Sequence, residues 1–376
     1  MDDIAGADSR DAELAVDGHD GSGVVQVLDR HGAAKAAEPD QAPGDGGEFQ
    51  ELRRLIRQHG LLDRQPGYYT FKIAASLILL AGCVAILATV ENLWWQMLNA
   101  AFMGFTFAQT AFLGHDAGHH QIARSARGND LVGLFVTFLV AMDLSWWVEK
   151  HNRHHANPNQ LGLDDDIEVS VLAFTEEQAL NKPGPLKLLV RYQAFFFYPV
   201  LLLSSLSLRF GGVYYLLFNG KAKYPVVEPL LLASHAVLYF LALYLFLGLW
   251  QGALFLLVHQ SVAGLLMGAT FAPNHKGMPV LPRDSDMDFL RQQVITSRNV
   301  RRHPITDLCY GGLNYQIEHH LFPSMPRNNL GKAQILVREF CRQHALSYHE
   351  TSVIGSNWEI LRHLHRVSRP LRSKKA

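Results

Sequence analysis

The sequence predicts an all-α integral membrane protein with four transmembrane helices in two hairpins, together with interfacial or re-entrant helices. Several runs of roughly 18 to 22 apolar residues are long enough to cross a hydrocarbon core of about 30 Å. Two pairs of these runs are separated by very short connections, which makes the paired helices antiparallel. Three histidine clusters lie near the ends of apolar runs. We therefore also expect a cytosolic helical domain that caps the membrane helices and holds a histidine-rich di-metal site.

Charge divides the 376 residues into an acidic beginning and a basic remainder. Residues 1–50 hold 12 acidic and 3 basic side chains, which leaves 22 acidic and 31 basic ones, since the chain has 34 of each. The first segment is poor in large apolar residues, so we expect residues 1–50 to form a disordered acidic tail. A membrane domain over residues 51–350 and a basic tail over 351–376 complete the expected organisation. The three cysteines are far apart and imply neither a disulfide framework nor a thiolate zinc site.

The expected spans are residues 73–90 and 93–113, followed later by 230–250 and 252–272. Basic residues stand before and after the first hairpin, so the positive-inside rule places both of its outer ends in the cytosol. With two complete hairpins, both chain termini and the histidine clusters are cytosolic. Just before the first span, residues 51–63 predict a short amphipathic helix, either on the membrane surface or in solvent.

Two further apolar runs, residues 131–148 and 192–208, are expected not to cross the membrane. If either run crossed, the histidine clusters would emerge on opposite faces of the bilayer and could not share a metal site. Asp143 interrupts the first run, and Pro199 interrupts the second. We interpret both as interfacial or re-entrant helices.

The clusters have spacings that suit metal coordination. On a helix, two histidines at positions i and i+4 lie on one face, whereas adjacent histidines diverge by about 100° and can serve two nearby ions. Imidazole binds iron, zinc, copper and nickel. The candidate ligands are His115, His119, His120, His151, His154, His155, His275, Gln316, His319 and His320. Asp116, Glu318 and Asn274 are expected to hydrogen-bond these ligands. A surface histidine patch is the alternative for any single cluster.

Other residues near the clusters are candidates for substrate binding. They are Trp146, Trp147, Lys150, Lys276, Arg301 and Arg302. Indole rings could shape an acyl tunnel, and basic groups could contact phosphates. Interfacial anchoring and the positive-inside bias are the alternatives. His235 and His259 lie within apolar runs, where they could line an acyl channel, bind haem or form hydrogen bonds in a packed interior.

Four motifs resemble those of the membrane fatty-acid desaturases. They are His-Asp-Ala-Gly-His-His at 115–120, His-Asn-Arg-His-His at 151–155, Asn-His-Lys-Gly at 274–277, and Gln-Ile-Glu-His-His followed by Leu-Phe-Pro at 316–323. The resemblance covers roughly residues 60–350. It is strongest to the subgroup whose third histidine box begins with Gln, which includes front-end desaturases of the linoleoyl-CoA, Δ6-like type.

The resemblance implies a histidine-ligated di-iron centre, for which zinc can substitute in purified protein, and O2 as co-substrate. It implies cis-desaturation of an acyl-CoA or acyl-lipid chain, His275 as an additional ligand, and Gln316 in a position that is histidine in many relatives. The chain contains no His-Pro-Gly-Gly haem motif of a fused cytochrome b5. We therefore expect a separate electron donor, either a ferredoxin or a free cytochrome b5 with its reductase. We expect no nucleic-acid partner. A bacterial plasma membrane is favoured, with the endoplasmic reticulum as the alternative.

Three other functions compete with this interpretation. A di-iron membrane hydroxylase would share the oxidant and act on a lipid or hydrocarbon. A histidine-rich metal transporter or sensor would call for ligands near the bilayer midplane rather than at its edge. A haem-b electron carrier would need paired histidines inside facing spans, for which only His235 and His259 qualify.

Overall fold

A computed structural model describes residues 47–373 of the chain. Nearly all of the acidic segment therefore lies outside the described residues. The prediction that this segment is disordered concerns residues that the structure does not describe. The described part is mostly helical, with one two-stranded sheet.

The first hairpin consists of α2 (Pro66–Thr89) and α3 (Leu93–Gly118). Polar side chains close the turn between them. Asn92 caps α3 by accepting hydrogen bonds from the backbone N–H groups of Trp94 and Trp95, at 3.0 and 3.2 Å. Gln96 donates back to the carbonyl of Ile86 at 3.0 Å. The first hairpin is thus built at the predicted place, and both helices extend beyond the predicted spans.

The second hairpin lies within α10 (Val227–His275), which folds back on itself at Gly248. This glycine has φ 70° and ψ −178°, a conformation that is essentially restricted to glycine. The hydroxyl of Tyr239 lies 2.6 Å from Nδ1 of His259. In a straight helix these two residues would be about 30 Å apart. The two halves of α10 are therefore antiparallel neighbours.

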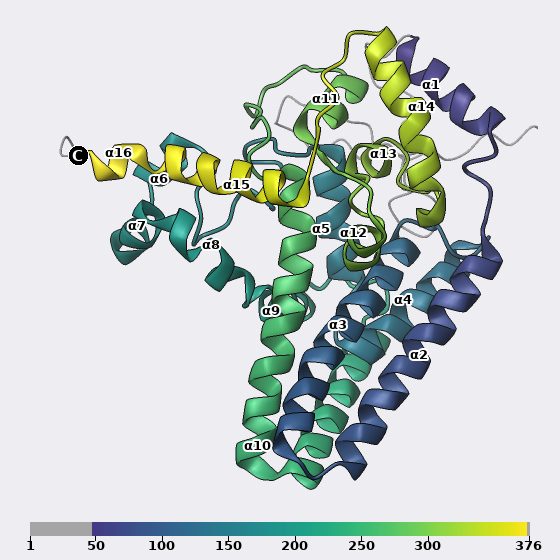
Figure 1. Cartoon of the computed structure of the whole chain (residues 1–376), viewed down its shortest axis with the longest axis vertical. Helices are drawn as coiled ribbons and strands as arrows, with labels where there is room; N and C mark the ends of the chain where they lie inside the picture. The colour runs from purple at the N-terminus through teal and green to yellow at the C-terminus, as the bar shows by residue number, and fades with distance from the viewer. Residues whose placement is uncertain (1–46, 374–376) are drawn as a thin grey trace, which may run out of the picture. The chain divides into compact units, whose positions relative to one another are not determined.

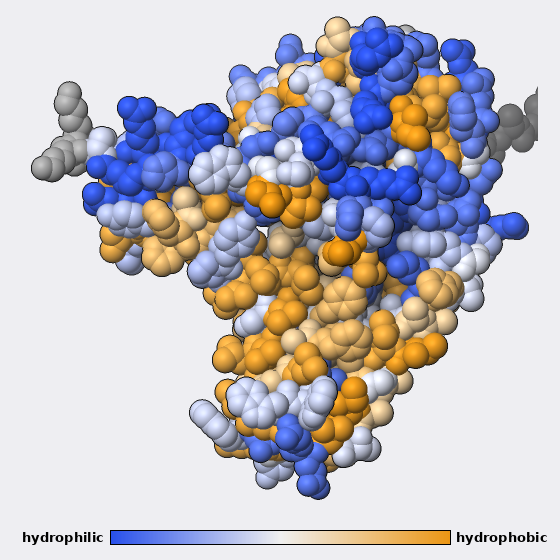
Figure 2. Space-filling view, in the orientation of Figure 1, coloured by the Kyte–Doolittle hydropathy of each residue, from blue (hydrophilic) through white to orange (hydrophobic). Residues whose placement is uncertain are grey.

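The two hairpins are packed side by side (Figure 1). Gly104 on α3 lies directly against the backbone of His259 and Ala263 on the second half of α10. Both segments run away from their hairpin turns, so they carry His115 and His275 to the same end of the bundle. The surface over α2, α3 and α10 in Figure 2 is predominantly apolar, as expected for helices that contact lipid.

Two further apolar segments are sharply bent. Helix α4 (Ala126–Val140) meets α5 (Leu144–Ala156) at 111°, and α8 (Gln193–Leu201) meets α9 (Ser204–Phe218) at 69°. Within the described residues, two helices, α2 and α10, are long and apolar enough to cross a membrane, and the number reaches four if each bent pair is one span. The chain is a membrane protein.

A helical layer covers the histidine-bearing end of the bundle. It contains α11 (Phe289–Thr296), α12 (Pro304–Cys309), α13 (Gln316–Leu321), the short helix η1 (Arg327–Asn329) and α14 (Leu330–Gln343). Strand β1 (Asn299–Val300) pairs in parallel with β2 (Glu350–Thr351). The core of this layer includes Leu290, Ile317 and Val337, all fully buried.

Helix α1 (Glu48–Gln58) belongs to the same layer and buries its apolar face in the protein. Leu52 and Ile56 are fully buried against this core, and Phe49 stacks on Phe322 with ring centroids 5.7 Å apart. The helix begins three residues before its predicted start, because Phe49 extends the apolar face that the layer buries.

The last segment of the chain also differs from the expected tail. Helix α15 (Val353–Val367) packs against α8 and α10 and buries Ile360 and Leu364 completely. Apolar residues four positions apart form a stripe beneath the basic residues, and this stripe requires a packing partner. The short helix α16 (Arg369–Arg372) packs beside α15, and α6 (Glu176–Leu180) and α7 (Gly184–Arg191) pack against α16.

Candidate metal centre

Four helices bring eight of the nine candidate histidines together. Helix α3 supplies His115 from its last turn and His119 from its C-cap, and α10 supplies its final residue, His275. Three more come from α5 and two from α13. The α5 set is His151, His154 and His155, and the α13 set is His319 and His320.

The larger histidine group contains side chains from all three histidine boxes. It comprises His115, His119, His151 and His319, each of which offers a ring nitrogen within 4.8 Å of the others. The Nε2 atoms of His115 and His319 lie 3.2 Å apart. His155 adjoins this group, since its Nε2 lies 3.1 Å from Nε2 of both His151 and His319.

The smaller group lies on the other side of His155. It comprises His154, His275 and His320. The Nε2 atoms of His154 and His275 are 3.2 Å apart. The rings of His155 and His320 are stacked with centroids 4.1 Å apart, so the two groups are in direct contact.

The spacing of these nitrogens is compatible with coordination of a shared metal ion. Ligands at about 2.0–2.1 Å from one ion, at angles between 90° and 110°, are separated by roughly 2.8 to 3.4 Å. The observed separations of 3.1 and 3.2 Å lie in this interval. In addition, the Nε2 atoms of His119 and His320 are buried without a hydrogen-bond partner. Buried polar atoms normally have partners, and a bound cation would supply them.

Burial keeps most of these imidazoles in the form that binds metal. Desolvation, and then repulsion between neighbouring rings, lowers the pKa of His151, His155, His275, His319 and His320 well below the usual value. A neutral imidazole has a free lone pair for a metal ion. His154 is different: burial lowers its pKa, but the nearby carboxylates of Asp164 and Asp166 outweigh this effect, and the pKa is raised.

Hydrogen bonds from neighbouring residues fix the orientation of several rings. Nδ1 of His115 lies 3.1 Å from Asp116, and Nδ1 of His154 lies 3.0 Å from Asp164. Nδ1 of His275 lies 3.1 Å from the carbonyl oxygen of Thr296. In each case the contact at Nδ1 directs Nε2 into the cluster.

Gln316 lies at the edge of the smaller group. Its Nε2 atom is 2.9 Å from Nε2 of His275, and its Oε1 accepts a hydrogen bond from Asn274 at 2.8 Å. Asn274 also donates to the carbonyl of Leu313 at 3.0 Å. The structure thus places Asn274 beside Gln316, where it fixes the orientation of that amide.

Two residues of the histidine boxes point away from the cluster. His120 is exposed and has φ 56°, because it ends α3 in a left-handed conformation. Within residues 47–373, Glu318 forms no hydrogen bond with an imidazole. Instead, its carboxylate accepts hydrogen bonds from Asn299 at 2.7 Å and Tyr348 at 2.8 Å. Burial raises the pKa of Glu318 to about 7. The expected bond from Glu318 to a ligand ring is therefore wrong, whereas Asp116 does contact His115.

The candidate substrate residues divide into three kinds. Trp147 stacks on His151 with ring centroids 4.4 Å apart, so it forms part of the wall of the cluster. Lys150 forms an ion pair with Asp166, and Lys276 donates to the backbone carbonyl of the same residue at 2.6 Å. Both lysines are thus engaged within the protein.

The remaining candidates lie farther out. Arg301 and Arg302 are exposed on the helical layer, and Arg302 lies 3.8 Å from Asp307. Trp146 lies beside α9 rather than beside the histidines. His235 donates from Nδ1 to the carbonyl of Phe138 at 2.7 Å.

The other intramembrane histidine, His259, contacts Tyr239 and the ring of Phe107. Phe107 lies against both His235 and His259, with centroids 6.1 and 4.3 Å away. Hydrogen-bonded packing describes this pair better than axial ligation of a haem.

Sequence reasoning missed several residues that position the ligands. Sequence analysis singled out neither Asp164, which contacts His154, nor Gln293, which lies 2.8 Å from Nδ1 of His320. Arg327, which pairs with Asp116, was also missed. A signal existed for Asp164: an acidic run shortly after a histidine box often supplies the carboxylates that orient ligand rings. No comparable signal marks Gln293 or Arg327.

Fold and site together define a membrane protein with a candidate histidine-rich metal centre. Residues 92–352 match the family described as fatty acid desaturase, and the chain belongs to this family. It is 32% identical over 345 residues to a Delta(5) fatty acid desaturase of Caenorhabditis elegans, covering 87% of this chain and 75% of that protein. It is 30% identical over 316 residues to a Delta(6)-fatty-acid desaturase of the same organism, covering 80% and 70%.

A third relative is longer than this chain. The chain is 29% identical over 340 residues to an acyl-lipid (9-3)-desaturase of Physcomitrium patens, covering 85% of this chain but only 62% of that protein. The predicted family is thus confirmed by these relatives.

Proposed function

We propose that the protein is an oxygen-dependent desaturase that introduces a cis double bond into the acyl chain of an acyl-CoA or acyl-lipid. The observation that carries this proposal is the convergence of eight imidazoles from four helices, in a chain of the desaturase family. In the reaction, a CH2–CH2 unit loses two hydrogen atoms. O2 takes up these atoms, two external electrons and two protons, and yields two molecules of water.

Two iron ions would be held by the two histidine groups. His115, His119, His151 and His319, with His155, would bind one ion, and His154, His275 and His320 would bind the other. Bound iron supplies the capacity to activate O2. Imidazole also binds zinc well, so a purified sample can hold zinc instead. In this proposal Gln316 lies beside Nε2 of His275 at the edge of the smaller group.

The surrounding residues prepare the site for this chemistry. Asp116, Asp164 and the carbonyl of Thr296 hold Nδ1 of three proposed ligands, so that Nε2 of each ring is directed into the cluster. Trp147 covers the ring of His151 and excludes water from that side of the site. These contacts supply a rigid, dry ligand set before substrate arrives.

The proposed topology has four spans, formed by α2, α3 and the two halves of α10. The bends of 111° and 69° support an arrangement in which the segments 126–156 and 193–218 enter the interface and return. The site and both termini would then be cytosolic, with electrons supplied by a separate ferredoxin or by cytochrome b5 and its reductase. The desaturase domain would cover residues 51–350, in a bacterial plasma membrane.

The test is expression in a host that lacks the activity, followed by location of new double bonds by mass spectrometry. We expect new cis double bonds with the native chain and none with His319→Ala at equal abundance in the membrane. New hydroxyl groups in place of double bonds would identify a hydroxylase. No lipid change with the native chain, in the presence of a donor system, would refute the proposed activity.

A further inference from the structure

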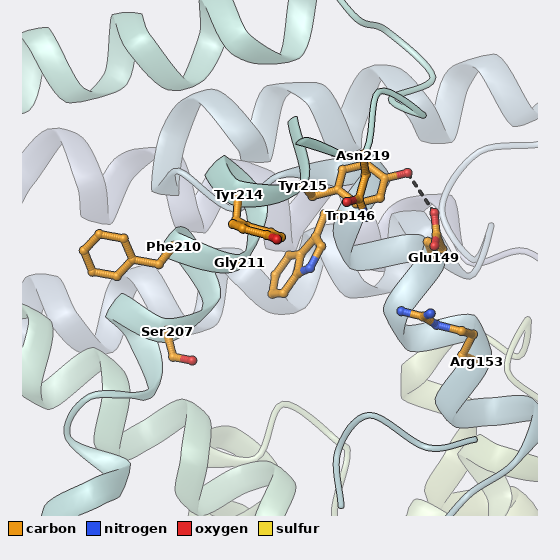
Figure 3. Close-up of a pocket in the computed structure, with 9 residues that line it drawn as sticks. All are labelled: Trp146, Glu149, Arg153, Ser207, Phe210, Gly211, Tyr214, Tyr215 and Asn219. Atoms are coloured by element: carbon orange, nitrogen blue, oxygen red, sulfur yellow. Dashed lines mark hydrogen bonds between the residues drawn. The ribbon is translucent and has the colours of Figure 1, made fainter. Parts of the chain in front are cut away.

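A cavity of about 520 Å³ lies between α5 and α9 (Figure 3). Its α5 wall is formed by Trp146, Glu149 and Arg153, which share one face of the helix. The histidines of the metal centre occupy a different face of the same helix, on which Trp147 stacks against His151. The cavity and the metal centre are thus separated by the width of α5.

One side of the cavity is aromatic and continuous with the apolar outer face of α9. Phe210 and Tyr214 line it and are 71% and 62% exposed. Farther along the same helix, Leu217 and Phe218 are 70% and 69% exposed. Residues of this kind face lipid in a membrane protein, so a molecule in the cavity can extend its apolar part along α9.

Trp146 completes the aromatic side because Gly211 makes room for it. A Cβ atom added to Gly211 would lie 2.4 Å from Cζ2 of Trp146. The indole therefore packs directly on the backbone of α9 and forms part of the cavity wall. Any larger residue at position 211 would displace the ring.

The other side of the cavity is polar and carries one charge of each sign. Glu149 accepts a hydrogen bond from Tyr215 at 2.8 Å and, within residues 47–373, has no basic group at ion-pair distance. Arg153 pairs with Asp165 through its NH2 group at 2.5 Å, and its side chain is half exposed. Figure 3 shows the guanidinium beside the cavity and Glu149 one helical turn away.

We propose that this cavity binds the head group of a zwitterionic phospholipid. The guanidinium of Arg153 suits the phosphate, and the carboxylate of Glu149 suits the ammonium group. The aromatic rings of Trp146 and Tyr214 favour a quaternary ammonium in particular. The volume lies within the range of small-ligand sites, and the lipid chains would follow α9.

This inference goes beyond the proposed function, because a lipid bound there lies on a different face of α5 from the histidine cluster. The same residues distinguish a zwitterionic lipid from coenzyme A. Coenzyme A carries several phosphate charges and calls for an excess of basic groups. The cavity offers a single arginine together with the carboxylate of Glu149, which repels additional anionic groups.

The experiment measures lipid binding to the purified full chain carrying His319→Ala, which needs no working metal centre. Dihexanoyl phosphatidylcholine, dihexanoyl phosphatidylglycerol and hexanoyl-CoA are titrated separately by calorimetry. We expect the phosphatidylcholine to bind at least about tenfold more tightly than the other two. Glu149→Gln should weaken phosphatidylcholine binding at least about tenfold, because one charge-assisted contact is lost.

The control is Glu177→Gln, an exposed glutamate on α6, which should bind phosphatidylcholine like the parent. Equal affinity for all three probes, or full phosphatidylcholine binding with Glu149→Gln and with Trp146→Leu, would overturn the proposed site. Binding is scored independently of product formation. Head-group binding by the His319→Ala chain, together with no new double bonds from the native chain in the expression test, would therefore refute the desaturase activity and leave the site intact.

Discussion

Arg327 places an amino group of its guanidinium 2.9 Å from Oδ2 of Asp116, and both side chains are almost completely buried. The other carboxylate oxygen of Asp116 lies 3.1 Å from Nδ1 of His115. Arg327 also donates to the carbonyl of Gly311 at 2.9 Å. The segment that follows the third histidine box therefore sets the orientation of a ligand in the first box.

We predict that Arg327→Met destabilises the protein by about 3–5 kcal/mol, since it leaves a buried carboxylate without its cation. Metal content should fall as well, because Asp116 would no longer hold His115 in place. Thermal unfolding in detergent and elemental analysis of the purified protein measure the two effects.

A double-mutant cycle separates the ion pair from general loss of packing. Asp116→Asn combined with Arg327→Met removes both charges, and we expect it to be more stable than Arg327→Met alone. The exposed pair of Arg342 and Glu339 provides the control, because Arg342→Met should leave the melting temperature nearly unchanged. Equal stability of the single and double variants would contradict the proposed coupling.

The structure separates two adjacent histidines that the sequence could not rank. His119 faces the larger histidine group, whereas His120 is exposed and lies outside it. We predict that His119→Ala abolishes double-bond formation and lowers metal content, and that His120→Ala retains most of both. Product analysis and metal analysis of the two variants, at matched expression, provide the measurement. Loss of metal with His120→Ala and not with His119→Ala would reverse the assignment.

A buried carboxyl group at the bend between α4 and α5 should affect stability in a pH-dependent way. Asp143 accepts a hydrogen bond from the backbone N–H of Trp146 at 2.8 Å, and its Oδ2 atom is buried without a partner. Burial, and the neighbouring carboxyl group of Glu228, raise the pKa of Asp143 to about 8. The folded protein therefore binds a proton that the unfolded chain has released, and this group destabilises the fold increasingly as pH rises from about 4 to about 8.

We predict that Asp143→Asn is more stable than the native chain, by a margin that grows over this pH range and then levels off. Asparagine keeps the cap of α5 and does not titrate. Unfolding of both proteins between pH 5 and pH 8.5 measures the margin. Asp284→Asn, at an exposed loop position, should show no such trend. A constant margin for Asp143→Asn would rule out a titrating group at this bend.

The sequence was most informative where one physical signal determined the structure. Length and hydropathy predicted both hairpins, and the short connection at Glu91–Asn92 predicted the first turn correctly. Histidine spacing identified the side chains that the structure brings together. Each of these signals is local, since it depends on residues within a few helical turns of one another.

The features that the sequence did not predict are contacts between segments far apart along the chain. Leu52 gave α1 an amphipathic pattern, but a membrane surface and a protein core bury such a face equally well. The apolar stripe of Ile360 and Leu364 in α15 likewise does not reveal which partner buries it. Arg327 could not be paired with Asp116, because 211 residues separate them and surface arginines are common.

The turn within α10 offers a test of the second hairpin. Gly248 has φ 70° and ψ −178°, and a Cβ atom added there would meet nothing within 4 Å. Any loss caused by Gly248→Ala must therefore come from backbone strain and not from a clash. We predict a loss of about 1–3 kcal/mol, since this conformation is essentially restricted to glycine. Gly82→Ala in α2 is the matched control, because its Cβ also meets nothing and its backbone is helical, so alanine should be neutral or stabilising. The measurement compares the melting temperatures of the two variants in the same detergent. Equal values would mean that α10 does not turn at Gly248. A lower value for Gly248→Ala alone would support the hairpin that brings His275 to the candidate metal centre.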